Sequence, residues 1–119
     1  MSTLSFDSFW AWLVQHPNCV LWAGTPDAVL YDDEDVHWYI GQDGEVAVAQ
    51  VIRGKRLVGN LVVDPARVDY VSVVGEAREG EHHFELIAET ETDRYAAYVF
   101  ALSHGMTEDE EPTHRFAIH

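Results

Sequence analysis

The stretch VHWYIGQDGEVAVAQVIRGKRLVGNLVV, residues 36–63, contains three apolar segments separated by two turn sequences. In the first segment, Val36, Trp38 and Ile40 alternate with more polar residues, which is the two-residue period of a strand with one buried face. The sequence QDG ends this segment. RGKR then predicts a two-residue hairpin in which Gly54 takes the positive φ of a type II′ turn. The stretch therefore predicts three consecutive antiparallel strands.

The two faces of the second segment differ in side-chain size. Val46, Val48 and Ile52 share one face of the predicted strand. Ala47 and Ala49 lie on the other face, where their side chains are small. Because small side chains let another element come close to the sheet, we expect a helix to pack against these alanines.

An amphipathic helix is predicted near the N-terminus. Its apolar side chains follow the i, i+3, i+4, i+7 spacing of one helix face: Phe6, Phe9, Trp10 and Leu13. Ser5 is a suitable N-cap, and Pro17 prevents the helix from continuing. Trp12 falls at the edge of the apolar stripe, and we expect it to close the core.

The rest of the chain predicts short strands. Apolar alternation or short apolar runs, bounded by turn sequences, occur at residues 19–22, 28–31, 67–74 and 82–89. For residues 67–74 the alternative is one helical turn after Pro65. Residues 94–104 fit either a helix or a strand. We favour the strand, because the segment is rich in aromatic and β-branched residues and follows another strand after a short polar turn.

The predicted fold class is α+β, with the N-terminal helix packed on a single antiparallel sheet of about six strands. Residues 1–119 have the length of one domain. An acidic C-terminal tail begins at about residue 105. Alternation at Phe116 and Ile118 leaves two alternatives for it: a flexible tail or a short edge strand.

The charge of the chain restricts its partners. Twenty-one acidic residues against seven Lys and Arg give a net charge of −14, and charging all seven histidines would leave the sign unchanged. Such a surface repels phosphate backbones and attracts cations or basic proteins. We therefore expect a protein partner rather than nucleic acid. A nucleic-acid mimic is a third alternative, for which Glu85, Glu89 and Glu91 are the candidate carboxylates.

The sequence also predicts a compartment. Cys19 is the only cysteine, which rules out an intrachain disulfide. The N-terminal segment has no basic residue before its apolar run and carries Asp7 within it, unlike a secretory signal. No stretch approaches the roughly 18 apolar residues of a membrane span. We expect a cytoplasmic protein that does not associate with membranes.

Four consecutive acids connect two predicted strands, and we call them the acidic turn: Asp32, Asp33, Glu34 and Asp35. A calcium loop needs alternating oxygen ligands and a glycine at its bend. His37 and Trp38 occupy the next such positions here, so the pattern fails. Because carboxylates repel one another and prefer water, a solvated turn is the favoured interpretation. Contact with a basic partner is the main alternative, and a bound metal ion is a further one.

Three of the seven basic residues lie at one predicted hairpin turn, and we call them the basic tip: Arg53, Lys55 and Arg56. A solubilising turn is again the favoured interpretation. The alternative is a contact in which the basic tip of one molecule meets the acidic turn of another. Such a contact would make association sensitive to salt.

The histidines suggest a metal site as a further alternative. If residues 82–89 pair with residues 94–104 and share their apolar faces, His82 and His104 lie on one face, and one register makes them direct neighbours. Opposed strand residues lie about 4.5–5.5 Å apart at Cβ, close enough for two imidazoles to share a metal ion. His114 is the candidate third ligand. No recognised metal-binding spacing supports this site, and no cofactor is predicted.

Catalytic motifs are lacking in the sequence. Cys19 leads into an apolar segment and is interpreted as a small buried hydrophobe. The glycines form no phosphate-binding loop, and the serines lie in no nucleophile elbow. The sequence nominates no reaction, and an enzyme is not the favoured interpretation.

The leading functional prediction is a small acidic, non-catalytic protein-interaction module, adaptor-like or chaperone-like, that acts as a dimer. Trp22, Trp38 and Tyr39 are candidates for an exposed aromatic patch, because tryptophan and tyrosine favour interface centres. The alternative is a domain that binds a small ligand or metal in a pocket beside the sheet, with or without catalysis.

Overall fold

The computed structural model describes residues 2–104, which form nine strands, one α-helix and two short 3₁₀ helices. The strands are β1 (Ser2–Leu4), β2 (Val20–Gly24), β3 (Val29–Tyr31), β4 (Val36–Asp43), β5 (Val46–Arg53), β6 (Arg56–Val63), β7 (Tyr70–Arg78), β8 (Glu81–Glu89) and β9 (Arg94–Leu102). The helix α1 spans Phe6–Val14, and the 3₁₀ helices η1 and η2 span Pro17–Cys19 and Pro65–Arg67.

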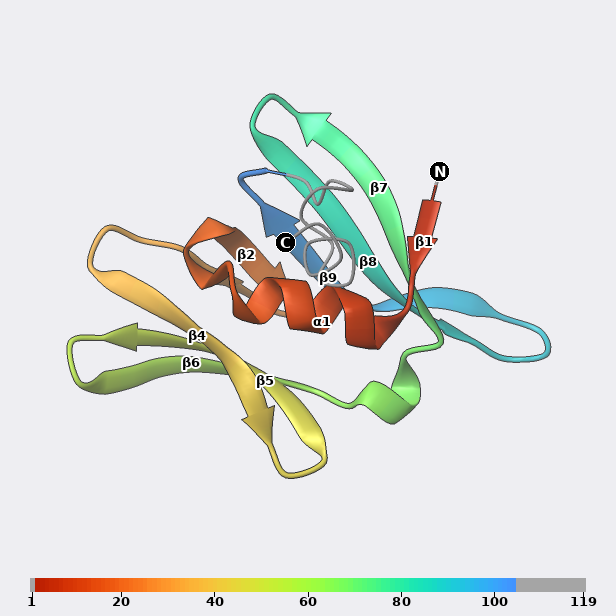
Figure 1. Cartoon of the computed structure of the whole chain (residues 1–119), viewed down its shortest axis with the longest axis horizontal. Helices are drawn as coiled ribbons and strands as arrows, with labels where there is room; N and C mark the ends of the chain where they lie inside the picture. The colour runs from red at the N-terminus through yellow and green to blue at the C-terminus, as the bar shows by residue number, and fades with distance from the viewer. Residues whose placement is uncertain (1, 105–119) are drawn as a thin grey trace, which may run out of the picture.

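The strands form two antiparallel sheets (Figure 1). One has six strands in the order β1-β7-β8-β9-β2-β3, and the other has three in the order β4-β5-β6. The predicted α+β fold with a single sheet is therefore wrong: the protein is mainly β, with one short helix.

The chain enters the three-stranded sheet between β3 and β4 and returns to the six-stranded sheet after β6. Pro65 has no N–H with which to continue the strand ladder. The Asp64 side chain accepts a hydrogen bond from the Ala66 N–H (3.0 Å) and caps the 3₁₀ helix η2. The chain therefore leaves β6 and starts β7 in the other sheet.

The three strands predicted from residues 36–63 are present. Arg53 is paired with Arg56 across a two-residue turn, and Gly54 has a φ of 65°, as the predicted hairpin requires. The ambiguous segment that starts at residue 94 forms the strand β9, paired with β8.

The N-terminal helix has the predicted cap and apolar face. The Ser5 hydroxyl accepts a hydrogen bond from the Ser8 N–H (3.1 Å). The helix side chains that are buried include all four predicted ones and Trp12, which is 1% exposed: Phe6, Phe9, Trp10, Trp12 and Leu13. Tertiary packing must hold this helix in place, because a nine-residue helix is marginal in isolation.

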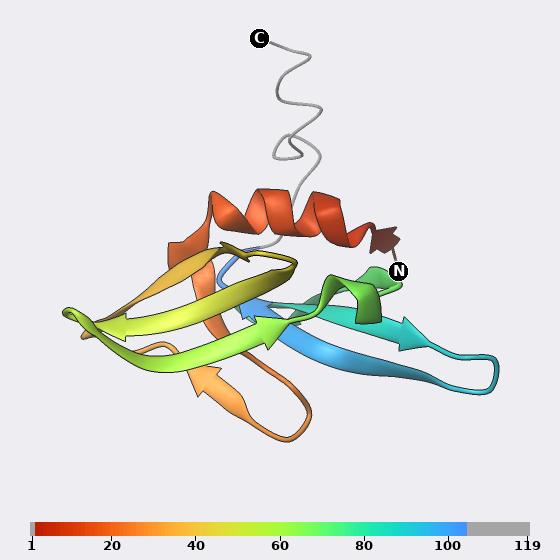
Figure 2. The same ribbon diagram turned by 90° about the horizontal axis from the view of Figure 1, so that it is seen from below.

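The helix packs against both sheets (Figure 2). The Phe9 ring lies 5.1 Å from the Phe84 ring of the six-stranded sheet, centroid to centroid. The indole Nε1 of Trp10 donates a hydrogen bond to the Gly41 carbonyl of β4 (3.1 Å). Ala47 and Ala49, on the face of β5 with small side chains, are fully buried in the same apolar cluster as the helix side chains. The inner faces of the two sheets and α1 thus share one core.

Two further expectations concern the membrane and the tail. Among residues 2–104, no helix is long and apolar enough to cross a membrane. The predicted C-terminal tail lies outside the described residues.

Candidate functional site: a groove between two strand edges

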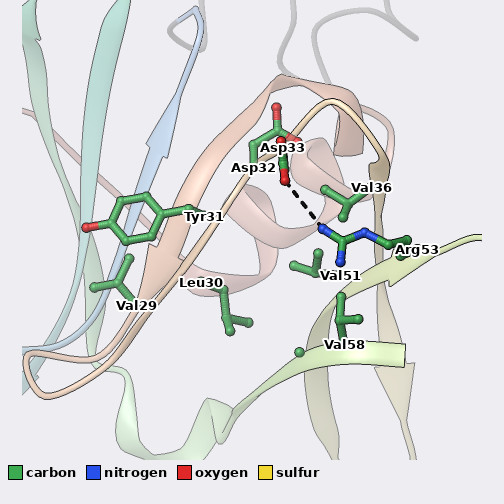
Figure 3. A pocket seen from close by; sticks show the side chains of 10 residues that line it. Val29, Leu30, Tyr31, Asp32, Asp33, Val36, Val51, Arg53 and Val58 are labelled. Atoms are coloured by element: carbon green, nitrogen blue, oxygen red, sulfur yellow. Dashed lines mark hydrogen bonds and ion pairs between the residues drawn. The ribbon is translucent and has the colours of Figure 1, made fainter. Parts of the chain in front are cut away.

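A groove lies where the two sheets approach each other (Figure 3). β3 is the last strand of the six-stranded sheet, and β6 is the last strand of the three-stranded sheet. Within residues 2–104, each of them has one edge that no other strand pairs with. The groove has a volume of about 310 Å³, and its lining comprises Val29, Leu30, Tyr31, Asp32, Asp33, Val36, Val51, Arg53, Val58 and Gly59.

The apolar floor of the groove depends on a glycine. Gly59 lies opposite Val51 on β5. A Cβ atom at position 59 would lie only 2.7 Å from Cδ2 of Leu30. The missing side chain therefore leaves room for Leu30, which reaches across from β3. The side chains of β3 and β5 thereby meet at the base of the groove.

A strand irregularity places Val58 at the side of the groove. The register changes from Val51 opposite Gly59 to Ile52 opposite Leu57, which leaves Val58 without an opposed residue on β5. A bulge of this kind redirects a side chain and bends the strand. Val58 lines the groove and is 46% exposed, so the groove offers apolar surface to a ligand.

Charged side chains form the rim at one end. Arg53 Nη2 lies 3.3 Å from Asp33 Oδ2, and both side chains are more than half exposed. Such an exposed pair contributes only about 0–1 kcal/mol of stability. Asp32 is held differently, because its Oδ1 accepts a hydrogen bond from Nε1 of Trp38 (3.2 Å). The rim therefore presents a fixed carboxylate beside a solvated ion pair.

The structure brings the acidic turn and the basic tip together within one chain. All four residues of the acidic turn are exposed, and two of them, Asp32 and Asp33, line the groove. Within the described residues, Arg53 is the only member of the basic tip in an ion pair; Lys55 and Arg56 are exposed. The predicted contact between two molecules stays a prediction.

The three candidate aromatics do not form one patch. Trp38 is buried in the core. Tyr39 precedes the buried Ile40 and lies half-exposed on the opposite face of β4. Trp22 is partly buried on the face of β2 opposite the buried Ala23. The exposed aromatic ring beside the groove is Tyr31 (68% exposed), which the sequence reasoning did not single out.

Trp22 belongs to a polar cluster on the outer face of the six-stranded sheet. Oε1 of Glu81 lies 2.7 Å from Nε2 of His83 and accepts a hydrogen bond from Nε1 of Trp22 (3.3 Å). The hydrogen bond with His83 is the main cause of a lowered pKa of Glu81; partial burial opposes it, and the Trp22 hydrogen bond adds to it. The cluster therefore favours an ionised carboxylate.

The predicted pairing of His82 with His104 is wrong. Phe84 lies opposite Phe100, which places His82 opposite Leu102. Pairing of the two phenylalanines thus shifts the register by two residues from the one that the metal site required. Nε2 of His82 lies 3.8 Å from Oε2 of Glu76 instead.

Among residues 2–104, no group of three or more His, Cys, Asp or Glu side chains is arranged to hold a metal ion. His114 lies outside the described residues. The three-histidine site as a whole is therefore not tested.

His104 contacts a thiol that the sequence did not connect with it. Its Nε2 lies 2.9 Å from Sγ of Cys19, so Cys19 is partly buried and polar in its surroundings rather than a buried hydrophobe. The His104 ring also packs edge-on against His16 and Trp12. The two partners are 85 residues apart in sequence, and no local pattern links them.

The groove residues that sequence reasoning missed are Leu30, Val51, Val58 and Gly59. One signal was present, because a glycine inside a strand often marks a close approach by another group. The identity of that group, Leu30, required the tertiary structure.

Comparison with known proteins adds nothing to this geometry: no family model, curated protein or solved structure matches the chain.

Proposed function

We propose that the protein is a non-catalytic interaction module that binds an extended segment of a partner protein in the groove between β3 and β6. The observation that supports this most directly is the position of an apolar, charged-rimmed groove over the three-stranded sheet and beside β3, a strand with one edge that lacks a strand partner within residues 2–104.

Strand addition is the recognition mode that fits this geometry. An extended peptide hydrogen-bonds to the free backbone of an edge strand, and its alternate side chains enter the adjacent groove. Val51, Val58 and Leu30 offer the apolar contacts for these side chains. Fully burying one large apolar side chain contributes roughly 1.5–3 kcal/mol. Two such side chains are enough for a weak, reversible complex.

Charge restricts the partner further. The chain carries −14 overall, and Asp32 and Asp33 lie at the rim. A segment with Lys or Arg beside its apolar residues is therefore favoured, and its association should slow as salt is added.

The groove supports peptide binding better than small-ligand binding. Its volume of about 310 Å³ is at the lower end of the range for ligand pockets, roughly 300–1,000 Å³. Tyr31, Asp33 and Val58 are all exposed along it. A small ligand would remain largely in contact with water, whereas an extended chain can cover these residues in succession.

We further propose that the module is a dimer. The support is the number of free strand edges: β1, β3, β4 and β6 each end a sheet within the described residues, and such edges are commonly covered by a second chain. Sedimentation equilibrium of the full chain tests this. A monomer at micromolar concentration would contradict it.

Selection from a random heptapeptide library on the immobilised full chain tests the binding function. We expect enrichment of peptides in which apolar residues alternate and a Lys or Arg lies beside them. Val58→Asp should abolish the enrichment, because it places a carboxylate in the groove beside Asp33.

Val62→Asp is the matched control. Val62 lies on the same strand, is 47% exposed and lies outside the groove lining. Enrichment should survive this change. No enrichment on the wild type, or equal enrichment on both variants, would contradict the proposal.

A further inference from the structure

We infer that two copies of this chain dimerise through the outer face of the three-stranded sheet, with the β5 strand of one copy antiparallel to the β5 strand of the other. The inference rests on the proposed dimer and places its interface on a sheet face rather than along a strand edge. It does not depend on peptide binding in the groove. The support comes from an apolar surface outside the core and from the charges at its two ends.

The three-stranded sheet buries one of its two faces in the core. On β5, Ala47, Ala49 and Val51 belong to the core cluster, and Val48 between the alanines does not, because alternate side chains of a strand point to opposite faces. The outer face carries five large apolar side chains, none of which belongs to that cluster: Tyr39, Val48, Ile52, Leu57 and Val62. Three of the five are about half-exposed. The face therefore offers apolar surface that no element among residues 2–104 takes into the core.

This surface is level enough for a second sheet to pack on it. A Cβ atom at Gly41 would lie 2.7 Å from Cζ of Tyr39, so the phenol ring lies over Gly41 instead of projecting away from the sheet. Gly41 is paired with Val48 of β5, which is only 5% exposed. The ring therefore lies along the face, and another sheet can approach to the usual face-to-face separation of about 10 Å.

The turns at the two ends of β5 carry opposite charges. Gly44 and Gly54 have φ values of 67° and 65°, and each is followed by an exposed charged residue, Glu45 in one turn and Lys55 in the other. The turns lie at opposite ends of the sheet (Figure 1). The eight residues of β5 separate them by roughly 23 Å, well beyond the Debye length of about 8 Å at physiological ionic strength. These charges therefore do not neutralise each other within one chain.

Symmetry and charge together select how two such faces meet. In a two-fold dimer the same patch of both copies is in contact, and aligned packing keeps the strands of the two sheets within about 30° of each other. With parallel strands, Lys55 would meet the partner's Lys55. With antiparallel strands, Lys55 meets the partner's Glu45, and this contact occurs twice. The antiparallel arrangement is therefore the complementary one.

The middle of the face fits the same arrangement. Gln50 of β5 is paired with Asn60 of β6, and this row of amides lies between the two apolar rows, so it meets its own copy at the two-fold axis. Amide side chains both donate and accept hydrogen bonds, so the row can bond to itself. The apolar row of Val48 and Val62 then faces the apolar row of the partner. No ionised side chain has to be buried at the centre.

The charge of the hairpin favours this face over other surfaces of the chain. Residues 46–63 carry no acidic residue and contain three of the seven basic ones, whereas the chain as a whole carries −14. Two acidic copies repel each other, and the repulsion is smallest where each presents its least acidic surface. A second copy is thus the occupant that the face and its ends match.

Val62→Asp in the full chain tests the interface by sedimentation equilibrium. It places a carboxylate in the apolar face, and we expect the dissociation constant of the dimer to rise at least about tenfold. Val58→Asp is the matched control: it lies on the same strand and is equally exposed, but it lines the groove, so the dimer should be unchanged. No effect of Val62→Asp, or equal effects of both variants, would overturn the inference.

The two variants also separate this inference from the proposed function. Heptapeptide enrichment should be lost with Val58→Asp and kept with Val62→Asp, the reverse of their effects on the dimer. A dimer that tolerates Val62→Asp while enrichment behaves as expected overturns the interface alone. A wild type that stays monomeric overturns the dimer and its interface but leaves peptide binding in the groove untouched.

Exchange of the end charges tests the antiparallel arrangement. Lys55→Glu and Glu45→Lys should each weaken the dimer about tenfold at low ionic strength, because each change makes two exposed contacts repulsive. Glu45→Lys reduces the net negative charge, so overall repulsion cannot cause its effect. The double variant Lys55→Glu, Glu45→Lys should restore the wild-type dissociation constant. Dimerisation that is strengthened by Glu45→Lys, or not restored in the double variant, would overturn the arrangement.

Discussion

Two glycines show at the residue scale how the backbone shapes the groove. At Gly59 a side chain, Leu30, occupies the space of a Cβ atom. At Gly24 the neighbours are backbone: a Cβ would overlap the carbonyl oxygen of Ala28 and lie 2.8 Å from Cα of Val29. Backbone atoms yield less easily than the end of a side chain. Gly24 therefore fixes how β3 returns alongside β2.

Gly24→Ala should destabilise the protein by about 2–3 kcal/mol, the cost of overpacking beside a rigid neighbour. Urea unfolding measures it. Gly41→Ala is the control, because there the atoms nearest to the Cβ belong to the phenol end of the half-exposed Tyr39. The explanation fails if the two variants lose the same stability.

Gly59→Ala should affect binding more than stability. The new methyl displaces Leu30 and takes up room at the base of the groove. We expect selected heptapeptides to bind about tenfold more weakly, with a loss of stability of roughly 1 kcal/mol or less. Isothermal titration calorimetry and urea unfolding of the same preparation separate the two effects. Undiminished peptide binding would contradict this role of Gly59.

Glu81 should give the molecule a measurable pH dependence. Its pKa is lowered from the ordinary 4.5, mainly by the hydrogen bond with His83. A carboxyl group with a lowered pKa in the folded state contributes stability above its unfolded pKa and loses it as the pH falls through the folded value. The destabilisation caused by Glu81→Gln should therefore be present at neutral pH and disappear in acid below pH 4.5.

An NMR titration of the Glu81 carboxyl group checks the cause. His83→Gln should move the pKa of Glu81 back towards 4.5, because it removes the hydrogen bond that lowers this pKa most. An unchanged titration would show that the Trp22 hydrogen bond accounts for the shift instead.

At the scale of elements, α1 combines a local and a non-local contribution. The cap at Ser5 is local, and Ser5→Ala should lower the free energy of unfolding by about 1 kcal/mol. Ser5→Asp should restore most of it, because aspartate caps equally well and favours the positive end of the helix dipole. Thermal unfolding of both variants measures this. A loss with Ser5→Asp equal to that with Ser5→Ala would argue against capping.

The helix and several strands could be predicted because their positions depend on residues that are close together in the sequence. The alternation in residues 36–63 indicated β4, β5 and β6, and Gly54 indicated their second turn, because both signals arise within a few residues. The bulge at Val58 gave no such signal. It results from how β6 pairs with β5, and it directs the side chain that lines the groove.

At the scale of the whole molecule, net charge opposes compactness. A charge of −14 on 119 residues causes self-repulsion in the folded state, and the described ion pairs with Arg53, His82 and His83 offset little of it. Raising the ionic strength at neutral pH should therefore raise the thermal unfolding midpoint by several degrees. Repeating the scan in mild acid, where carboxylates are protonated, should shrink the effect. A midpoint that falls with salt would contradict this balance.

The prediction of a single sheet failed at this larger scale. Pro65 cannot continue a strand ladder, but a break in a strand does not say which sheet the next strand joins. The His82 register failed for a related reason: local alternation allowed every register that kept the apolar faces together. In the register that forms, Phe84 lies opposite Phe100. Both rings then contact the ring of Phe9 on the helix.

Local periodicity was enough to locate the strands of residues 36–63 and the capped helix with its buried face, because these depend on residues a few positions apart. The separation into two sheets, the groove between β3 and β6, and the contact of Cys19 with His104 arise from residues far apart in the chain. Several arrangements of the chain satisfy the local pattern equally well. The packing of the shared core determines which of them forms.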